Sequence, residues 1–240
     1  MKNWHILLII GLAGVASLWL ASFAQLVPGE QLSHMMRGLI LVQPTILTVT
    51  AVAVGQAFAA KVGLGTPLID ALLRGNNHRI VLQRQLPAAL LTGLAVGLLM
   101  IAYARVILPL VTDAATMAKM TAFPVPLTTR ILYGGITEEL LTRWGLMSFF
   151  AWALLRLTGK GEVRQSILWA AVIMAAALFA AGHLPLLFAI VAQPQPALIA
   201  ATLLTNFVPG LLFGWLFWRR GLEAAMFSHA FAHCVNALAS

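Results

Sequence analysis

Long apolar runs recur along the whole chain and constrain its fold more than any other feature. Residues 4–24, 86–112 and 165–182 are each long enough to cross the hydrocarbon core of a bilayer, which takes about 20 apolar residues in a helix. Of the 240 residues, 61% are hydrophobic and 9% are charged, and the mean hydropathy is +0.92. Soluble domains carry about 25% charged residues. The solvent for most of this chain is therefore expected to be lipid.

The apolar runs are continuous and lack the alternation of period two that a membrane barrel requires. Because lipid offers no hydrogen bonds, the backbone must satisfy its own polar groups, which helices do within each segment. The sequence therefore predicts an all-α, polytopic integral membrane protein with about seven transmembrane helices. No soluble domain fits between them, so residues 1–240 are expected to form a single transmembrane domain. The expected helices cover residues 4–24, 38–60, 86–112, 127–156, 165–183, 196–218 and 221–239.

The positions of Lys and Arg predict the orientation, because short cytoplasmic loops are enriched in both residues. Lys2, the connection 61–84, the connection 156–164 and the pair Arg219 and Arg220 all fall on one side of the expected bundle. The amino terminus is therefore expected in the cytoplasm and the carboxy terminus outside, in a bacterial inner membrane. The basic residues form no stripe with interleaved aromatics, so nucleic acid is not an expected partner.

Ionisable residues inside the expected spans are the candidates for function, because burying them is costly without partners or a purpose. They gather in the second half of the chain, residues 127–240, and Arg130 near its start is interpreted as reaching back to the interface. The candidates stand in three groups on different helices: Glu138, Glu139 and Arg143; His183; His229 and His233.

The two adjacent glutamates are expected to have different surroundings. Glu139 and Arg143 are four residues apart and share a helix face, where an ion pair can form. Glu138 lies about 100° further round the helix axis. We interpret Glu139 as the partner of Arg143, and Glu138 as a carboxylate that faces a polar cavity and acts as general base on a water molecule. An inert ion network that braces the helices is the alternative.

The histidines allow two kinds of chemistry. His229 and His233 are four residues apart, a spacing that suits metal ligation or a pair of hydrogen-bond donors. Phe179 precedes His183 by the same interval, and Gly182 and Pro185 are expected to end that helix beside a cavity. At 1.5 Å per residue, Glu138 and His183 lie roughly 27 Å from the basic ends of their helices. His229 lies only about 14 Å from the basic end of its own helix, so one shared site requires tilted or projecting helices.

These groups resemble the motif set of the CPBP family, the CAAX prenyl endopeptidase and bacteriocin-processing (Abi) intramembrane proteases. That family shows Glu-Glu-x-x-x-Arg, then Phe-x-x-x-His, then His-x-x-x-Asn or Asp, and the same order and spacing occur here. The matching positions are Glu138, Glu139 and Arg143; Phe179 and His183; His229 and His233. The departure is His233, which stands where the family has Asn or Asp.

The resemblance implies cleavage of a peptide bond in a membrane-associated or lipidated substrate. Glu138 and His183 would activate water, and His229 with His233 would stabilise the oxyanion. Glu138, His183, His229 and His233 would also supply the ligands of zinc or another divalent metal, and a metal-free mechanism remains equally open. The alternative function is a non-catalytic membrane protein that binds a partner or transfers ions or protons. Convergence of Glu138, His183 and His229 on one cavity, within about one water of each other, would favour the peptidase, and scattered side chains would favour bracing or transport.

Overall fold

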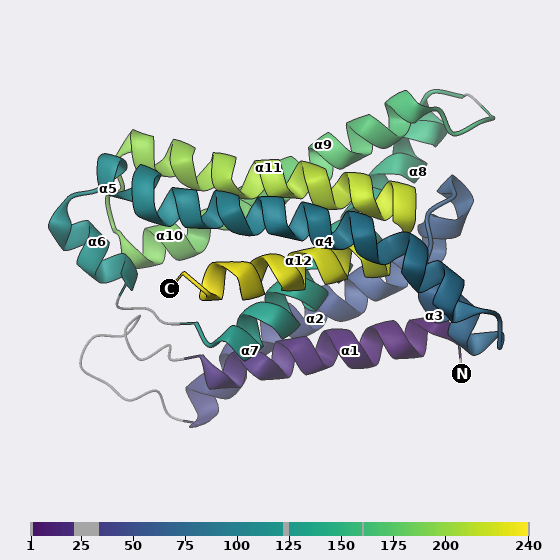
Figure 1. Ribbon diagram of the computed structural model, residues 1–240, viewed down its shortest axis with the longest axis horizontal. Coiled ribbons are helices and arrows are strands. Elements are labelled where there is room, and N and C mark those ends of the chain that lie inside the picture. Colours follow the sequence, from purple (N-terminus) through teal and green to yellow (C-terminus); the bar gives the residue numbers. More distant parts are fainter. Residues whose placement is uncertain (1, 22–33, 122–124, 160, 240) are drawn as a thin grey trace.

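The computed structural model describes residues 2–21, 34–121, 125–159 and 161–239, and within these ranges every regular element is a helix (Figure 1). The prediction of an all-α fold is therefore confirmed. In chain order the helices are α1 (Asn3–Ser17), η1 (Leu18–Leu20), α2 (His34–Phe58), η3 (Ala59–Val62), α3 (Pro67–Leu73), α4 (His78–Ala102), η4 (Tyr103–Ile107), α5 (Leu108–Val111), α6 (Ala114–Thr121), α7 (Leu127–Thr129), η5 (Arg130–Glu138), η6 (Leu140–Met147), α8 (Ser148–Leu157), α9 (Gln165–Ala181), α10 (Leu184–Ile190), α11 (Pro196–Arg220) and α12 (Leu222–Ala237).

Five helical stretches are long and apolar enough to cross a membrane by length and composition. Two further predicted spans are helical but do not meet that criterion, so the predicted count of seven is not established. One of them is the continuous helical run over residues 127–157, and the other is α12, which has 16 residues. The first carries Glu138, Glu139 and Arg143, and the second carries His229 and His233. The five stretches are Asn3–Leu20, His34–Val62, His78–Val111, Gln165–Ile190 and Pro196–Arg220.

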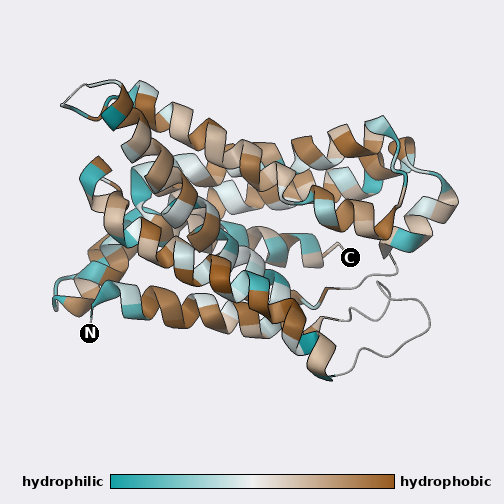
Figure 2. Cartoon of the chain, turned by 180° about the vertical axis from the view of Figure 1, so that it is seen from behind, coloured by the Kyte–Doolittle hydropathy of each residue, from teal (hydrophilic) through white to brown (hydrophobic). Residues whose placement is uncertain are grey.

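Apolar side chains cover the outside of the bundle. Figure 2 shows hydrophobic residues along the length of the outer helices, with hydrophilic residues gathered towards the two ends. Large apolar residues such as Leu39, Leu91 and Leu110 are exposed, and Leu91 retains 71% of its accessible surface. A soluble protein rarely exposes so much contiguous apolar surface. This surface fits lipid as the surrounding solvent.

Helix α12 is held between α4, α11 and η5, which places its histidines inside the bundle. Glycines on two of these neighbours make the close approach possible. A Cβ atom at Gly93 of α4 would lie 2.6 Å from the carbonyl oxygen of Ser228, and one at Gly135 of η5 would lie 2.8 Å from Cβ of Ala230. Larger residues at either glycine would push α12 away.

The bundle has two ends that differ in charge. We call the end that contains Asn3, Leu157 and Arg220 the basic end, and the end that contains Leu20, Leu127 and Ala237 the opposite end. The described Lys and Arg residues at the basic end are Lys2, Lys61, Arg74, Arg79, Arg84, Arg156, Arg164, Arg219 and Arg220. Those at the opposite end are Arg37, Arg105 and Lys119.

A buried polar network at the basic end fixes where α12 begins. Glu223 is 4% exposed and accepts a hydrogen bond from the backbone N–H of Ile69 at 2.9 Å. Gln85 Nε2 donates to Glu223 Oε2 at 3.2 Å and to the carbonyl of Arg220 at 2.8 Å. Gly221 has a positive φ of 98°, which a side chain would strain. The turn from α11 into α12, and hence the depth of His229, is set by these contacts.

Candidate active site

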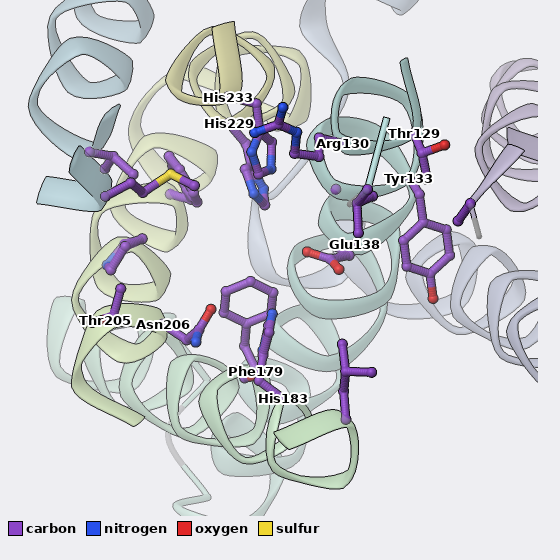
Figure 3. Close-up of a pocket in the computed structure, with 18 of the residues that line it drawn as sticks. Thr129, Arg130, Tyr133, Glu138, Phe179, His183, Thr205, Asn206, His229 and His233 are labelled. Atoms are coloured by element: carbon purple, nitrogen blue, oxygen red, sulfur yellow. The ribbon is translucent and has the colours of Figure 1, made fainter. Parts of the chain in front are cut away.

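The four residues predicted to act on the substrate line one cavity. Glu138 comes from the end of η5, His183 from the junction of α9 and α10, and His229 and His233 from α12 (Figure 3). The cavity has a volume of about 280 Å³. Segments up to 95 residues apart in the sequence therefore contribute to one site, because His233 lies 95 positions after Glu138. Glu138, His183 and His229 therefore share one cavity, which is the first of the two conditions that the peptidase hypothesis sets.

The helix that carries the glutamates is π-helical on both sides of Glu139, over η5 and η6. Such widened turns occur most often at functional sites. Glu138 is partly exposed and lines the cavity, whereas Glu139 is fully buried behind it. Glu139 Oε1 lies 3.2 Å from Nη1 of Arg143, so the expected ion pair is present. The two adjacent carboxylates have different surroundings, as their spacing predicted.

Arg143 is 1% exposed and does not line the cavity. Its Nη2 donates to the carbonyl of Gly210 on α11 at 3.0 Å, and Nη1 donates to Thr142 Oγ1. The guanidinium also lies over the faces of Phe179 and Phe213, 4.9 and 5.5 Å from the ring centroids. A buried cation needs such a complete set of partners. Arg143 therefore braces η6 against α9 and α11 and holds Glu139.

The His229 ring is fixed on three sides. Its Nδ1 lies 2.8 Å from Glu139 Oε1. Phe213 stacks against the ring with centroids 4.6 Å apart, and His233 stacks with centroids 4.9 Å apart. A carboxylate accepts but does not donate, so Nδ1 carries the proton and Nε2 is the nitrogen left for other partners. Glu139 thus orients His229 as well as pairing with Arg143.

His183 is oriented by its own helix. Its Nδ1 lies 2.8 Å from the carbonyl oxygen of Phe179. A carbonyl only accepts, so Nδ1 donates the hydrogen bond. The neutral ring then has an unprotonated Nε2, which can accept a proton or a hydrogen bond from water. The Phe179 ring packs edge-on against the imidazole at 4.8 Å. The Phe-x-x-x-His spacing therefore sets both the tautomer and the position of His183.

His233 replaces the Asn or Asp of the family motif and occupies space that a glycine provides. A Cβ atom at Gly134 of η5 would lie 2.7 Å from His233 Nε2. His233 Nδ1 is buried and has no hydrogen-bond partner among the described residues. An unpaired buried nitrogen is costly. His233 is therefore a polar group available for a ligand in the cavity.

The depth of the site is explained by the unequal reach of the helices. Glu139 and His229 touch, although their distances from the basic ends of their own helices differ. Figure 1 shows that the ends of α8 and α9 extend beyond the junction of α11 and α12. The distance along the helix from Glu139 to the end of α8 is therefore longer than the distance from His229 to the start of α12, because α8 extends further in that direction.

Five further polar residues line the cavity that the motif analysis did not assign to it: Thr129, Arg130, Tyr133, Thr205 and Asn206. The interpretation of Arg130 as an interface residue is therefore wrong, because its side chain lies beside the histidines (Figure 3). Asn206 donates from Nδ2 to the carbonyl of Thr202 at 2.8 Å, within α11. No spacing signal marks Tyr133 or Asn206, since each stands alone on its helix. Only the packing of the helices brings them to the site.

The candidate metal ligands line one cavity but are not gathered into a close cluster. Within the described residues, no group of three or more His, Cys, Asp or Glu side chains is close enough to hold one. Glu138, His183, His229 and His233 line the same cavity without forming such a group. Metal dependence therefore stays a prediction for experiment, and the chemistry below is derived from the side chains alone.

The fold and the cavity together define a polytopic membrane protein with paired glutamates and histidines gathered inside its helical bundle. Residues 120–235 match the sequence model of a family described as Rce1-like, Type II CAAX prenyl endopeptidase Rce1-like. This match supports membership of the CPBP family, the family that the motifs resemble. No curated protein and no solved structure matches the chain.

Proposed function

We propose that the protein is an intramembrane endopeptidase that hydrolyses a peptide bond with water activated by Glu138 and His183. The observation that carries the proposal is the position of Glu138, His183, His229 and His233 around one cavity. The burial of Glu139 and Arg143 behind that cavity supports it, because a preorganised electrostatic environment is what such catalysis needs. An inert brace would not require a second, cavity-facing carboxylate.

The proposed reaction uses the side chains in fixed roles. Glu138 takes a proton from water while His183 Nε2 holds the water by a hydrogen bond, and the water oxygen attacks the carbonyl carbon of the scissile bond. The carbonyl oxygen becomes an oxyanion. Glu138 then gives its proton to the amide nitrogen as the carbon–nitrogen bond breaks. One proton of the water ends on the leaving amine and the other stays on the new carboxyl group, so the products are a carboxylic acid and an amine.

His229 and His233 are proposed to stabilise the oxyanion. Because Nδ1 of His229 is held by Glu139, Nε2 can donate only when both ring nitrogens carry protons. Glu139 balances that positive charge. Removing one donor of this kind typically lowers kcat by about 10²–10³.

A second cavity, of about 690 Å³, provides the proposed path for the apolar part of the substrate. It lies between α2 and the junction of α9 and α10, and its lining is mostly apolar. Glu138, Phe179 and His183 line both cavities, so the second cavity reaches the proposed catalytic pair. This arrangement supports a substrate that is embedded in the membrane or anchored to it by a lipid.

Substrate trapping tests the proposal. The Glu138→Gln variant keeps the size and polarity of the side chain but cannot take a proton from water, so it should retain bound peptide. Membrane extracts captured with this variant and analysed by mass spectrometry should contain peptides that wild-type protein cleaves. The matched control is Glu162→Gln, which changes a glutamate outside the cavity. Equal peptide recovery with both variants would contradict the proposal.

A further inference from the structure

The cavity extends towards one end of the bundle and is closed towards the other. Ala21 directly follows η1, Val125 precedes α7, and both line the cavity at the opposite end. Leu186 of α10 lines it on the same side. Among the lining residues of α11, Phe213 is the one nearest the basic end. The lining therefore runs from the middle of the bundle to the opposite end.

An apolar layer separates the cavity from the basic end. Its residues are almost inaccessible, with exposed fractions between 0 and 6%. Beneath this layer lies the network of Gln85 and Glu223, which closes the start of α12 against α3. The layer bounds the 280 Å³ cavity on this side, whereas the second cavity continues beside the layer along α2 as far as Val54. The layer consists of Trp144, Leu216, Phe217, Leu222 and Met226.

The charges identify the compartments at the two ends. Lys and Arg in short connections favour the cytoplasmic side, and nine of the described Lys and Arg residues stand at the basic end against three at the opposite end. The basic end is therefore expected in the cytoplasm. We call the part of the cavity that is lined by Ala21, Val125 and Leu186 its mouth. The mouth is then expected on the other side of the membrane.

We propose that the site takes its substrate from the extracytoplasmic side of the membrane, as a peptide segment that lies next to a membrane anchor and outside the cytoplasm. This inference rests on the proposed function and narrows its substrate class. A lipidated carboxyl terminus that remains in the cytoplasm would meet the closed, basic end of the bundle. A membrane-anchored or exported peptide would meet the mouth near Val125, with its apolar part in the cavity beside α2.

Single-cysteine labelling tests the direction of the mouth without relying on catalysis. The chain has one cysteine, Cys234, so Cys234→Ser provides a cysteine-free background. In that background, Val125→Cys probes the mouth, and Ala115→Cys and Gln83→Cys mark exposed positions at the opposite and basic ends. On intact cells, a membrane-impermeant maleimide should label Val125→Cys and Ala115→Cys. The same reagent should label Gln83→Cys only after the cells are permeabilised.

The reverse pattern would overturn the inference. So would labelling of Val125→Cys only after permeabilisation, or no labelling of Val125→Cys under conditions that label Ala115→Cys, because the mouth would then face the cytoplasm or be closed.

A cleavage assay separates this inference from the proposed function. Single-span reporters that carry the test segment next to the membrane on one side or the other are co-expressed with wild-type protein or with Glu138→Gln. Cleavage of the extracytoplasmic segment by wild type alone, at least tenfold above the cytoplasmic segment, is the expected result. Preferential cleavage of the cytoplasmic segment would overturn the inference. Labelling from outside with no cleavage of either reporter would refute the peptidase activity and leave the orientation of the cavity intact.

Discussion

His229 Nδ1 lies 2.8 Å from Glu139 Oε1, inside a bundle where the carboxylate is fully buried. The same oxygen lies 3.2 Å from Arg143. One carboxylate oxygen therefore orients a proposed catalytic imidazole and neutralises a buried guanidinium. This arrangement explains the spacing Glu-Glu-x-x-x-Arg. The second glutamate, Glu139, pairs with the buried Arg143 and also holds His229 in the cavity.

Glu139→Gln should destabilise the protein and reduce its activity. Glutamine leaves Arg143 buried without its charge partner, and breaking such a pair costs about 3–5 kcal/mol. It also removes the charge that supports a protonated His229. The Tm in detergent should fall well below that of wild type, whereas Glu162→Gln should leave it unchanged. A Glu139→Gln protein with wild-type Tm and activity would show that the pair has neither role.

Gly134→Ala should reduce activity more than it reduces stability. The added methyl group would lie 2.7 Å from His233 Nε2, so the imidazole must shift within the cavity. Overpacking of this kind costs about 1–3 kcal/mol. The matched control is Gly38→Ala on α2, where no atom lies within 4 Å of the added Cβ. Turnover measured for both variants should fall for Gly134→Ala alone, and equal turnover would argue against a tight His233 pocket.

His233→Asn should remain active, and His233→Leu should lose about 10²-fold in turnover. Asparagine supplies the amide donor that the family uses at this position, whereas leucine supplies none. Both variants remove the ring that stacks on His229, so the comparison isolates hydrogen bonding from stacking. The measurement is kcat at saturating substrate for the two proteins. Similar losses in both would indicate that stacking on His229, not donation, is what His233 contributes.

Chelation should leave the activity unchanged. The proposed reaction needs only a Glu–His pair and imidazole donors, and the described side chains form no group that fits a metal ion. Purified protein treated with EDTA or 1,10-phenanthroline, then dialysed, should cleave substrate at the untreated rate. Loss of cleavage after chelation, with recovery on addition of zinc alone, would contradict the metal-free version and support the metal-bound one.

The sequence predicted the helical class and the motif groups because both depend on local patterns. Apolar runs determine helices in lipid, and an interval of four residues determines which side chains share a helix face, as for Phe179 with His183. The ion pair of Glu139 with Arg143 follows from the same interval. Features of this kind need no knowledge of how distant segments pack.

Other features depend on packing and left no signal along the chain. The contact of Glu139 with His229 joins residues 90 positions apart. Arg130 and Asn206 reach the cavity only because η5 and α11 face it. The direction in which the cavity extends could not be predicted from spacing either, since it depends on which ends of the lining helices meet around it.

Cleavage by purified protein in liposomes tests the central claim most directly. Wild type, Glu138→Gln and His183→Ala are reconstituted with a membrane-anchored peptide whose cleavage is followed by mass spectrometry, and circular dichroism confirms that all three are folded. The account predicts cleavage by wild type and at least a 10²-fold loss in each variant, because Glu138 moves the proton and His183 holds the water. Cleavage by both variants at the wild-type rate would contradict it, and proton flux without cleavage by the wild type would favour a transporter.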